Sequence, residues 1–257
     1  MIMRSARDAA THSVHRTLFA AALALSAAVN ACASEQDMTL ERHRLVEKIE
    51  AEVRMTSREL GFDRLEPMVA EAMRQVPRHA FVPSAQRALA YANHPLPIGN
   101  GQTISQPYIV AIMSQLLGVG PGDRVFELGT GSGYQAAVLA AMGVEVYSVE
   151  IVPALAERAI ANLAAAGYPQ VRVRAGDGWL GWPEAAPFDG IILTAAAPEI
   201  PERLVGQLRP GGRLVMPVGG VDSIQQLAVF DKGEDGSLRR RDLLPVRFVP
   251  VTGPLGD

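Results

Sequence analysis

Residues 125–134 read Val125-Phe126-Glu127-Leu128-Gly129-Thr130-Gly131-Ser132-Gly133-Tyr134. The apolar start predicts a buried strand, and the three glycines predict a sharp turn whose backbone can lie close to a ligand. A helix is expected next, over residues 136–142. A glycine-rich turn can also be a tight connection that binds nothing, so the neighbouring segments must decide between these interpretations.

The spacing of the glycines separates two classes of cofactor. A dinucleotide site needs G-x-G-x-x-G, with the pyrophosphate at the N-terminus of the following helix. Here Gly129, Gly131 and Gly133 give G-x-G-x-G, and Glu127 stands just before the turn. A carboxylate at that position would repel a pyrophosphate but suits a cationic amine. The loop therefore favours S-adenosylmethionine, which carries an α-amino group and a sulfonium, over NAD.

Two later segments support a nucleoside ligand. A second apolar strand, residues 144–149, ends at Glu150, about 20 positions past the glycines, where a carboxylate can accept from both ribose hydroxyls. After a third strand at residues 171–174, Asp177 can accept from the adenine amine and Trp179 can pack near the ring. The alternatives are an Asx turn for Asp177 and a core position for Trp179, and for the tryptophan the core position is favoured.

Composition limits the remaining functions. The 257 residues, 48% hydrophobic and 20% charged, suit one globular domain with an appendage. A net charge of −3 gives no basic field for nucleic acid, and the run Arg239-Arg240-Arg241 is expected in a solvated turn. With Cys32 as the only cysteine and five scattered histidines, we expect no internal disulfide and no metal site. His79, alone after a proline-terminated helix, is expected to be structural.

Residues 1–37 are expected to be an extension outside the domain. Three arginines precede the apolar residues 18–29, and Ala31-Cys32-Ala33 follows, which is typical of a secretory signal peptide over residues 1–33. Cys32 also faintly resembles a lipoprotein acylation site. S-adenosylmethionine is made in the cytoplasm, so export would separate the enzyme from its methyl donor. A start at Met38 would remove this conflict. We favour a cytoplasmic protein, with a periplasmic or lipid-anchored protein as the alternative.

Residues 38–257 predict a single α/β domain. Amphipathic helices are expected around residues 45–53 and 65–76, followed by a long loop over residues 83–101 with a short helix at 85–91. Residues 38–117 would form a helical and substrate-loop region, and residues 118–257 a cofactor-binding sheet. Further strands are expected at residues 188–195 and 213–218 and in a hairpin of 226–230 with 243–249. Strands that alternate with helices predict a doubly wound, mostly parallel seven-stranded sheet that binds ligands at the carboxyl ends of its strands.

Four segments resemble one known family. Residues 76–83 (Val-Pro-Arg-His-Ala-Phe-Val-Pro), 95–99 and 101–107 (Gly-Gln-Thr-Ile-Ser-Gln-Pro), together with the glycine loop, are similar to the protein-L-isoaspartate O-methyltransferases. The resemblance runs from about Arg42 to Gly253. It implies the Rossmann-like class I methyltransferase fold, S-adenosylmethionine as methyl donor, and the free carboxylate of isoaspartyl residues in damaged proteins as acceptor. The chain departs from the family at Asn93-His94, where a more acidic pair is expected, and in residues 1–37.

The resemblance also assigns site residues. The active-site serine carries over onto Ser105, and substrate contacts carry over onto the preceding residues and the C-terminal segment that lines the peptide cleft: Thr103, Ile104, Val249 and Pro250. The cofactor contacts carry over onto Glu127, Gly129, Thr130, Gly131, Ser132, Gly133, Glu150, Asp177 and Gly178. The implied partners are isoaspartyl proteins and peptides, without nucleic acid or metal, and we expect a monomer.

The chemistry of this reaction agrees with the residues present. A carboxylate is already ionised near neutral pH, so it can attack a sulfonium methyl without a general base. Catalysis then depends on in-line positioning and exclusion of water. Ser105 would orient the acceptor carboxylate rather than act as a nucleophile. The alternative role for Ser105 is the N-cap of a helix with Pro107 at its first position.

Two other functions remain open. A methyltransferase for a small molecule or RNA would share the glycine loop and Glu150 but should lack Thr103-Ile104-Ser105. Methyltransferases that act on nitrogen often carry Asn/Asp-Pro-Pro-aromatic where residues 194–198 read Thr-Ala-Ala-Ala-Pro. A non-catalytic exported binding protein is supported only by the N-terminal segment.

Overall fold

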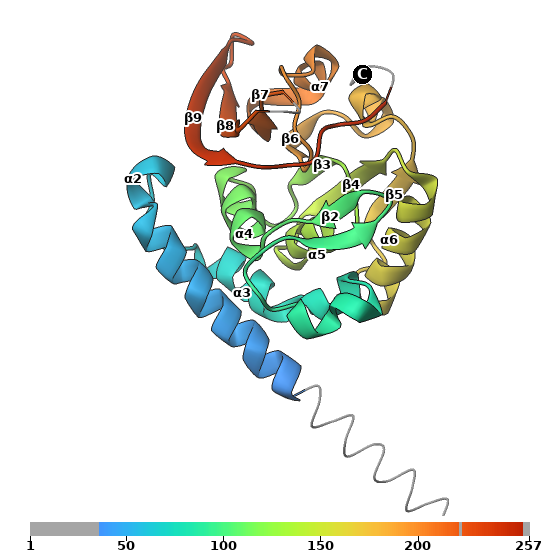
Figure 1. Ribbon diagram of the computed structural model, residues 1–257. Coiled ribbons are helices and arrows are strands. Elements are labelled where there is room, and N and C mark those ends of the chain that lie inside the picture. The colour runs from blue at the N-terminus through green and yellow to red at the C-terminus, as the bar shows by residue number, and fades with distance from the viewer. Residues whose placement is uncertain (1–35, 221–222, 254–257) are drawn as a thin grey trace, which may run out of the picture. The chain divides into compact units, whose positions relative to one another are not determined.

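The computed structural model describes residues 36–220 and 223–253 (Figure 1). The chain divides into two compact units, residues 1–41 and 42–257, and the central sheet belongs to the second unit. The signal-peptide-like segment at residues 1–33 lies outside the described residues. Within the described part of the chain, no helix is long and apolar enough to cross a membrane.

A seven-stranded sheet forms the centre of the second unit. Its order is β5-β4-β3-β6-β7-β8-β9; the strands from β5 to β7 pair in parallel, whereas β8 and β9 are antiparallel additions. This confirms the predicted doubly wound, mostly parallel sheet. The strands are β3 (Arg124–Leu128), β4 (Glu145–Glu150), β5 (Arg172–Ala175), β6 (Phe188–Leu193), β7 (Leu208–Val218), β8 (Gln225–Lys232) and β9 (Leu238–Val246).

Helices cover the sheet because its central strands are buried on both faces, as parallel strands normally are. α3 (Pro67–Gln75), α4 (Pro107–Leu116) and α5 (Tyr134–Ala141) pack against one another, and α6 (Pro153–Ala165) packs against β4 and β5. α7 (Glu202–Gln207) packs against β7 and the short 3₁₀ helix η3 (Gly178–Leu180). Trp179 of η3 belongs to the buried core with Phe126 and Leu214, as favoured from the sequence.

The N-terminal part of this unit differs in detail from the expectation. Residues 42–55 are helical, and the short α2 (Ser57–Leu60) ends at Gly61, whose φ is 80°. The expected loop at residues 83–101 contains its predicted short helix, but its end forms a strand that was not predicted. It holds 3₁₀ helix η2 (Ser84–Leu89), preceded by η1 (Arg78–Phe81), and it leads into an antiparallel hairpin of β1 (Leu96–Gly99) and β2 (Gln102–Ile104).

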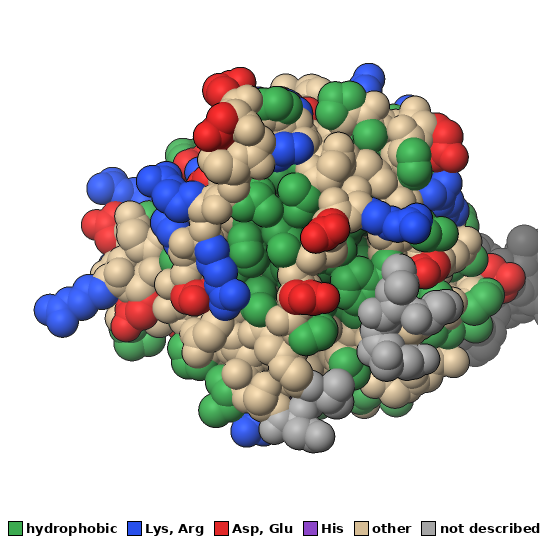
Figure 2. Space-filling view, turned by 90° about the horizontal axis from the view of Figure 1, so that it is seen from above, with side chains coloured by type: hydrophobic (Ala, Val, Ile, Leu, Met, Phe, Trp, Pro, Cys, Tyr) green, Lys and Arg blue, Asp and Glu red, His purple; other side chains and the backbone are tan. Residues whose placement is uncertain are grey.

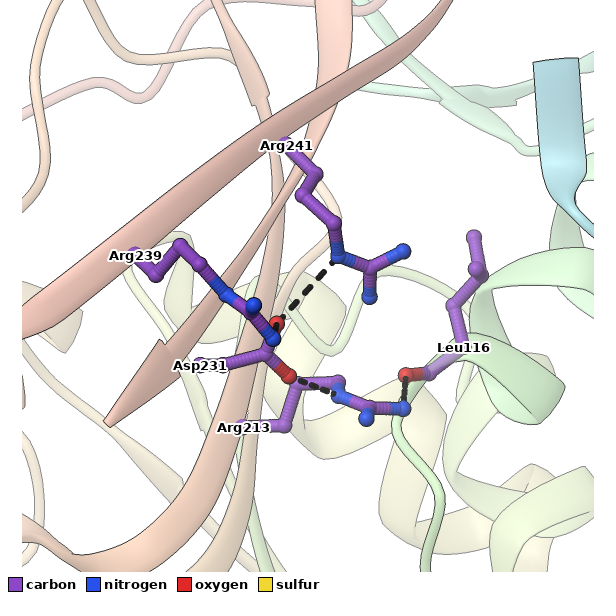
Figure 3. Close-up of polar contacts among 5 residues, drawn as sticks. All are labelled: Leu116, Arg213, Asp231, Arg239 and Arg241. Carbon is purple, nitrogen blue, oxygen red and sulfur yellow. Dashed lines mark hydrogen bonds and ion pairs between the residues drawn. The ribbon is translucent and has the colours of Figure 1, made fainter. Parts of the chain in front are cut away.

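The arginine run lies in a strand, so its prediction as a turn was wrong. Asp231 on β8 lies opposite Arg213 on β7 and Arg239 on β9 in the strand register. Its carboxylate forms ion pairs with both of these arginines and with Arg241 (Figure 3). Arg213 Nη1 donates to the carbonyl of Leu116 at 2.8 Å, which ties the end of α4 to the sheet.

On the face that Figure 2 shows, acidic and basic side chains surround a hollow lined by apolar ones.

Replacing Asp231 with asparagine should destabilise the fold by about 1–2 kcal/mol at pH 7, because three guanidinium groups lose their shared carboxylate. Burial raises the pKa of Asp231, but the hydrogen bonds and charges of Arg213 and Arg241 outweigh it and leave that pKa below its usual value. The contribution is therefore present near neutral pH and lost as pH falls through the lowered folded-state pKa. Urea unfolding at pH 7 and at about pH 2, below the lowered pKa, measures both effects.

The exposed pair of Arg240 and Asp242 supplies the control for this prediction. Asp242→Asn should cost less than half as much at pH 7, since that carboxylate serves one arginine at the surface. Equal losses of unfolding free energy in the two variants would show that sharing Asp231 among three arginines adds no stability.

A candidate active site at the carboxyl ends of the strands

A pocket opens at the carboxyl ends of β3, β4 and β6. The chain runs outward from β3 through β4 to β5 and then crosses back to β6 on the other side of β3. Such a switch in strand order creates a crevice at the carboxyl ends of parallel strands. The glycine loop, the residues after β4 and β6, hairpin β1–β2 and the C-terminal segment form the walls. We call this the cofactor pocket. Its lining includes Gly129, Thr130, Gly131, Ser132, Glu150 and Gly178 from the predicted cofactor set.

The glycine loop has no room for side chains where it meets its neighbours. Gly129 has a φ of 96°, and a Cβ there would lie 2.6 Å from Thr194 Oγ1. The Thr194 hydroxyl lies 2.5 Å from the Gly129 carbonyl and 3.0 Å from that of Leu128, so it donates to the backbone at the end of β3. A Cβ on Gly178 would lie 2.5 Å from Leu128 Cγ. Both glycines line the pocket, and these close approaches exclude a larger residue at either position.

Glu150 lies where the sequence places it, at the end of β4. Its side chain is 4% exposed and lines the cofactor pocket. Oε2 accepts from the Gly131 amide at 2.7 Å, and Oε1 accepts from the Val152 amide at 3.0 Å. A carboxylate oxygen can accept two hydrogen bonds, so both oxygens keep capacity for a diol.

Glu127 does not lie where the sequence argument needed it. The side chain is fully buried behind the glycine loop and is not part of the pocket lining. The Ser148 hydroxyl donates to its Oε2 at 2.5 Å and lies 2.5 Å from the Thr130 hydroxyl, while Oε1 has no hydrogen-bond partner among the described residues. Burial raises the pKa of Glu127 to about 8, against the lowering effect of Ser148 and with a smaller rise from Glu150. The raised pKa favours the protonated form near pH 7, and the buried position keeps the carboxyl out of the pocket lining.

Two other predicted cofactor residues, Asp177 and Gly133, do not line the pocket either. Asp177 accepts from the Trp179 amide at 2.9 Å and so caps η3, which is the Asx-type alternative. Its neighbour Gly178, not Asp177, lines the pocket. Gly133, with a φ of 91°, is the N-cap of α5 and packs against Leu163 rather than lining the pocket.

A second, larger pocket adjoins the first. We call it the acceptor groove; its wall is mostly apolar, with Pro95, Ile109, Val246 and Phe248 among its residues. Four residues line both pockets and therefore stand at their junction: Thr103, Ser105, Thr194 and Val249. Ile104 and Pro250, predicted as substrate contacts, line only the cofactor pocket.

Ser105 is not the N-cap of α4, so that alternative was wrong. The cap position is Gln106, and Asn93 Oδ1 accepts from the Tyr108 amide at 3.0 Å. Asn93 Nδ2 also donates to Glu52 at 2.6 Å, so the departure from the family pattern at Asn93 has a structural role. Within the described residues, no hydrogen bond involves the hydroxyl of Ser105, which leaves it available to a ligand at the junction.

The C-terminal segment is held against the residues that follow β6. The Ala196 amide donates to the Val249 carbonyl and the Val251 amide donates to the Ala196 carbonyl, both at 2.8 Å. These bonds extend the wall of the site beyond β9. They bring Val249 to the junction and Thr252 to the cofactor pocket.

Sequence reasoning missed some lining residues and correctly set others aside. Thr194, at the carboxyl end of β6, could have been found from the rule that ligands bind at that end of parallel strands. Gln102, Tyr134 and Gln135 also line the cofactor pocket. His79 is buried, with Nδ1 2.7 Å from the Tyr91 hydroxyl, and lines neither pocket, as expected of a structural histidine. No group of three or more potential metal ligands occurs in the described part of the chain.

Comparisons with known proteins agree on one family. Residues 53–256 match the family model of protein-L-isoaspartate(D-aspartate) O-methyltransferase. The chain is 58% identical over 212 residues to protein-L-isoaspartate O-methyltransferase 2 of Syntrophobacter fumaroxidans, covering 82% of this chain and 86% of that protein. It is 48% identical over 236 residues to protein-L-isoaspartate O-methyltransferase 1 of Cupriavidus necator, covering 92% and 91%.

Solved structures show the same fold. A protein-L-isoaspartate O-methyltransferase superposes with a TM-score of 0.72 at 30% identity, covering 82% of this chain and 67% of the other. A Plasmodium falciparum structure of the same family name, solved with S-adenosyl-L-homocysteine, gives a TM-score of 0.67 at 24% identity over 81% of this chain and 96% of that one. The chain therefore belongs to the protein-L-isoaspartate O-methyltransferases, a family of S-adenosylmethionine-dependent enzymes that methylate protein carboxyl groups.

Proposed function

We propose that this chain methylates the free carboxylate of L-isoaspartyl residues in damaged proteins at the junction of its two pockets. The observation that carries the proposal is the position of Ser105, whose hydroxyl has no partner among the described residues and which lines both the cofactor pocket and the acceptor groove. A donor in one pocket and an acceptor in the other can meet only where the two share a wall.

The cofactor pocket suits S-adenosylmethionine, which supplies an electrophilic methyl group on a sulfonium. Backbone of Gly129–Ser132 would lie against the methionine part, Glu150 would accept from the ribose hydroxyls, and Gly178 would face the adenine. Gly129 and Gly178 both line the pocket, and a larger residue at either position would collide with Thr194 or Leu128, which supports a role for glycine at these positions.

The acceptor needs orientation rather than activation. Its carboxylate is ionised near neutral pH, so no residue has to remove a proton. Ser105 would donate a hydrogen bond to one carboxylate oxygen and leave the other free to attack. Thr103 and Val249, at the same junction, would hold the substrate backbone, and the apolar groove would exclude water from the reacting groups.

Matched peptides test this function directly. Two synthetic peptides that differ only in an isoaspartyl or an aspartyl linkage should give methyl incorporation from labelled S-adenosylmethionine into the isoaspartyl peptide alone. Discrimination should be large, because a misplaced carboxylate loses both the Ser105 hydrogen bond and its alignment. Equal labelling of both peptides would refute the substrate assignment, and binding of cofactor without any labelling would indicate a non-catalytic protein.

We also propose that residues 38–257 form the catalytic domain, which works as a monomer in the cytoplasm. The family match over residues 53–256 supports the extent of this domain. The need for a methyl donor that is made in the cytoplasm supports the compartment. Gel filtration and mass spectrometry of the N-terminus after cell fractionation test these points.

A further inference from the structure

Helix α6 touches two different walls of the cofactor pocket. Arg158 and Asn162 lie four residues apart on this helix, so they share one face. Arg158 Nη1 donates to the carbonyl of Ile98 in hairpin β1–β2 at 2.7 Å. Asn162 Nδ2 donates to the carbonyl of Ser132 in the glycine loop at 3.1 Å. One rigid helix thus holds both the hairpin wall and the glycine-loop wall.

The hairpin lies outside the seven-stranded sheet, and its buried residues Leu96, Ile98 and Ile104 pack it onto the domain. It is a separate two-stranded sheet, and a two-stranded hairpin is marginally stable without packing partners. Its turn contains Gly99, Asn100 and Gly101 in succession, with φ values of 93°, 54° and 72°. The pairing register skips Ile98, which leaves its carbonyl outside the strand pairing. Arg158 takes this carbonyl, so the irregularity in the hairpin is the point at which α6 holds it.

The two walls also meet each other. Ile98 is buried, and a Cβ added to Gly131 would lie 3.5 Å from its Cδ1, within ordinary contact distance. On the other side of the loop, a Cβ on Gly133 would lie 3.0 Å from Leu163 Cγ on α6. The position of the hairpin relative to the glycine loop therefore depends on where α6 holds each of them.

We propose that Arg158 and Asn162 are positioning residues that set the spacing between the hairpin and the glycine loop, and thereby the affinity for the methyl donor. Neither side chain lines the cofactor pocket, so each acts through the backbone that it holds. The proposal rests on the function proposed above, because the hairpin wall also carries Thr103 and leads directly to Ser105 at the junction.

Replacement of Arg158 by methionine tests the hairpin contact. We expect the Kd of S-adenosylhomocysteine and the KM of S-adenosylmethionine to rise about three- to tenfold, because one hydrogen bond is lost. The value of kcat should change less than about twofold. Arg158→Lys, which can still donate to Ile98, should recover part of the loss. Arg203→Met on α7 is the matched control, since Arg203 is exposed and lines neither pocket, and it should change nothing.

A second comparison separates positioning from general stability. Asn162→Ala should also weaken cofactor binding. In the double variant the Kd should rise by less than the product of the two single increases, because loss of either contact already releases the spacing between the two walls. An unchanged Kd in Arg158→Met, or strictly multiplicative losses, would overturn the proposal. Failure of the wild type to methylate isoaspartyl peptide would overturn the function, while the Kd measurements would still test the contacts.

Discussion

Replacing Ser105 with alanine should lower kcat for an isoaspartyl peptide by about 10- to 100-fold and leave the Kd of S-adenosylhomocysteine within about twofold of wild type. A hydrogen bond to a charged acceptor is worth about 1.5–3 kcal/mol, and alignment of the attacking oxygen adds to the loss. Cofactor affinity should persist because the glycine loop and Glu150 lie on separate elements. Initial rates with the peptide, together with calorimetry of S-adenosylhomocysteine binding, measure the two quantities.

Ser132 provides a matched control, since it lines the cofactor pocket but not the acceptor groove. Ser132→Ala should act mainly on cofactor affinity and have little effect on kcat. If Ser105→Ala instead reduced cofactor binding alone, the serine would belong to the cofactor site. An unchanged kcat would remove it from the reaction.

The sequence predicted the sheet and the place of the site because both follow from backbone requirements. Strands β3, β4 and β6 are largely apolar runs; β3 is followed by Gly129 and β4 ends at Glu150, and parallel strands bring their carboxyl ends to one edge. Gly129 and Gly131 were found for the same reason, since a positive φ next to a ligand strongly favours glycine.

Side-chain direction was the part that the sequence could not give. Glu127, two residues before Gly129, is buried behind the loop, and Asp177, between two glycines, caps a 3₁₀ helix. Ser105 looked like a helix cap, but Asn93, 12 residues earlier, performs that role from across the fold. These outcomes depend on contacts between distant segments, which no local pattern encodes.

The arginine run failed for a different reason. Alternating directions along β9 place Arg239 and Arg241 beside Asp231 and place Arg240 beside Asp242 and the Phe230 ring. Charge density suggested a solvated turn because the pairing of Arg239 and Arg241 with Asp231 depends on the register of β8 and β9, which neighbouring sequence does not encode. Lysine or arginine on an edge strand also discourages pairing with another sheet.

Replacing Glu127 with glutamine should remove a loss of stability that the wild type undergoes as pH rises. The folded-state pKa of Glu127 is raised to about 8, so between the ordinary value near 4.5 and about 8 the folded protein keeps a proton that the unfolded chain has released. Stability therefore falls across this range and levels off above it. At about 1.4 kcal/mol for each pH unit, the decline could reach about 5 kcal/mol as an upper limit.

Urea unfolding of both proteins between pH 5 and pH 9 at constant ionic strength measures this difference. Glutamine resembles the protonated acid in shape and cannot ionise, so the variant should gain on the wild type by several kcal/mol between pH 5 and pH 8. Ser148→Ala should extend the wild-type decline to higher pH, because the Ser148 hydrogen bond lowers the pKa of Glu127. Parallel curves for wild type and Glu127→Gln would show that the carboxyl is charged in the folded protein. In that case Glu127 would supply the negative charge that a cationic amine needs. If the carboxyl is neutral, the role of Glu127 is to hold Ser148 and Thr130 behind the loop.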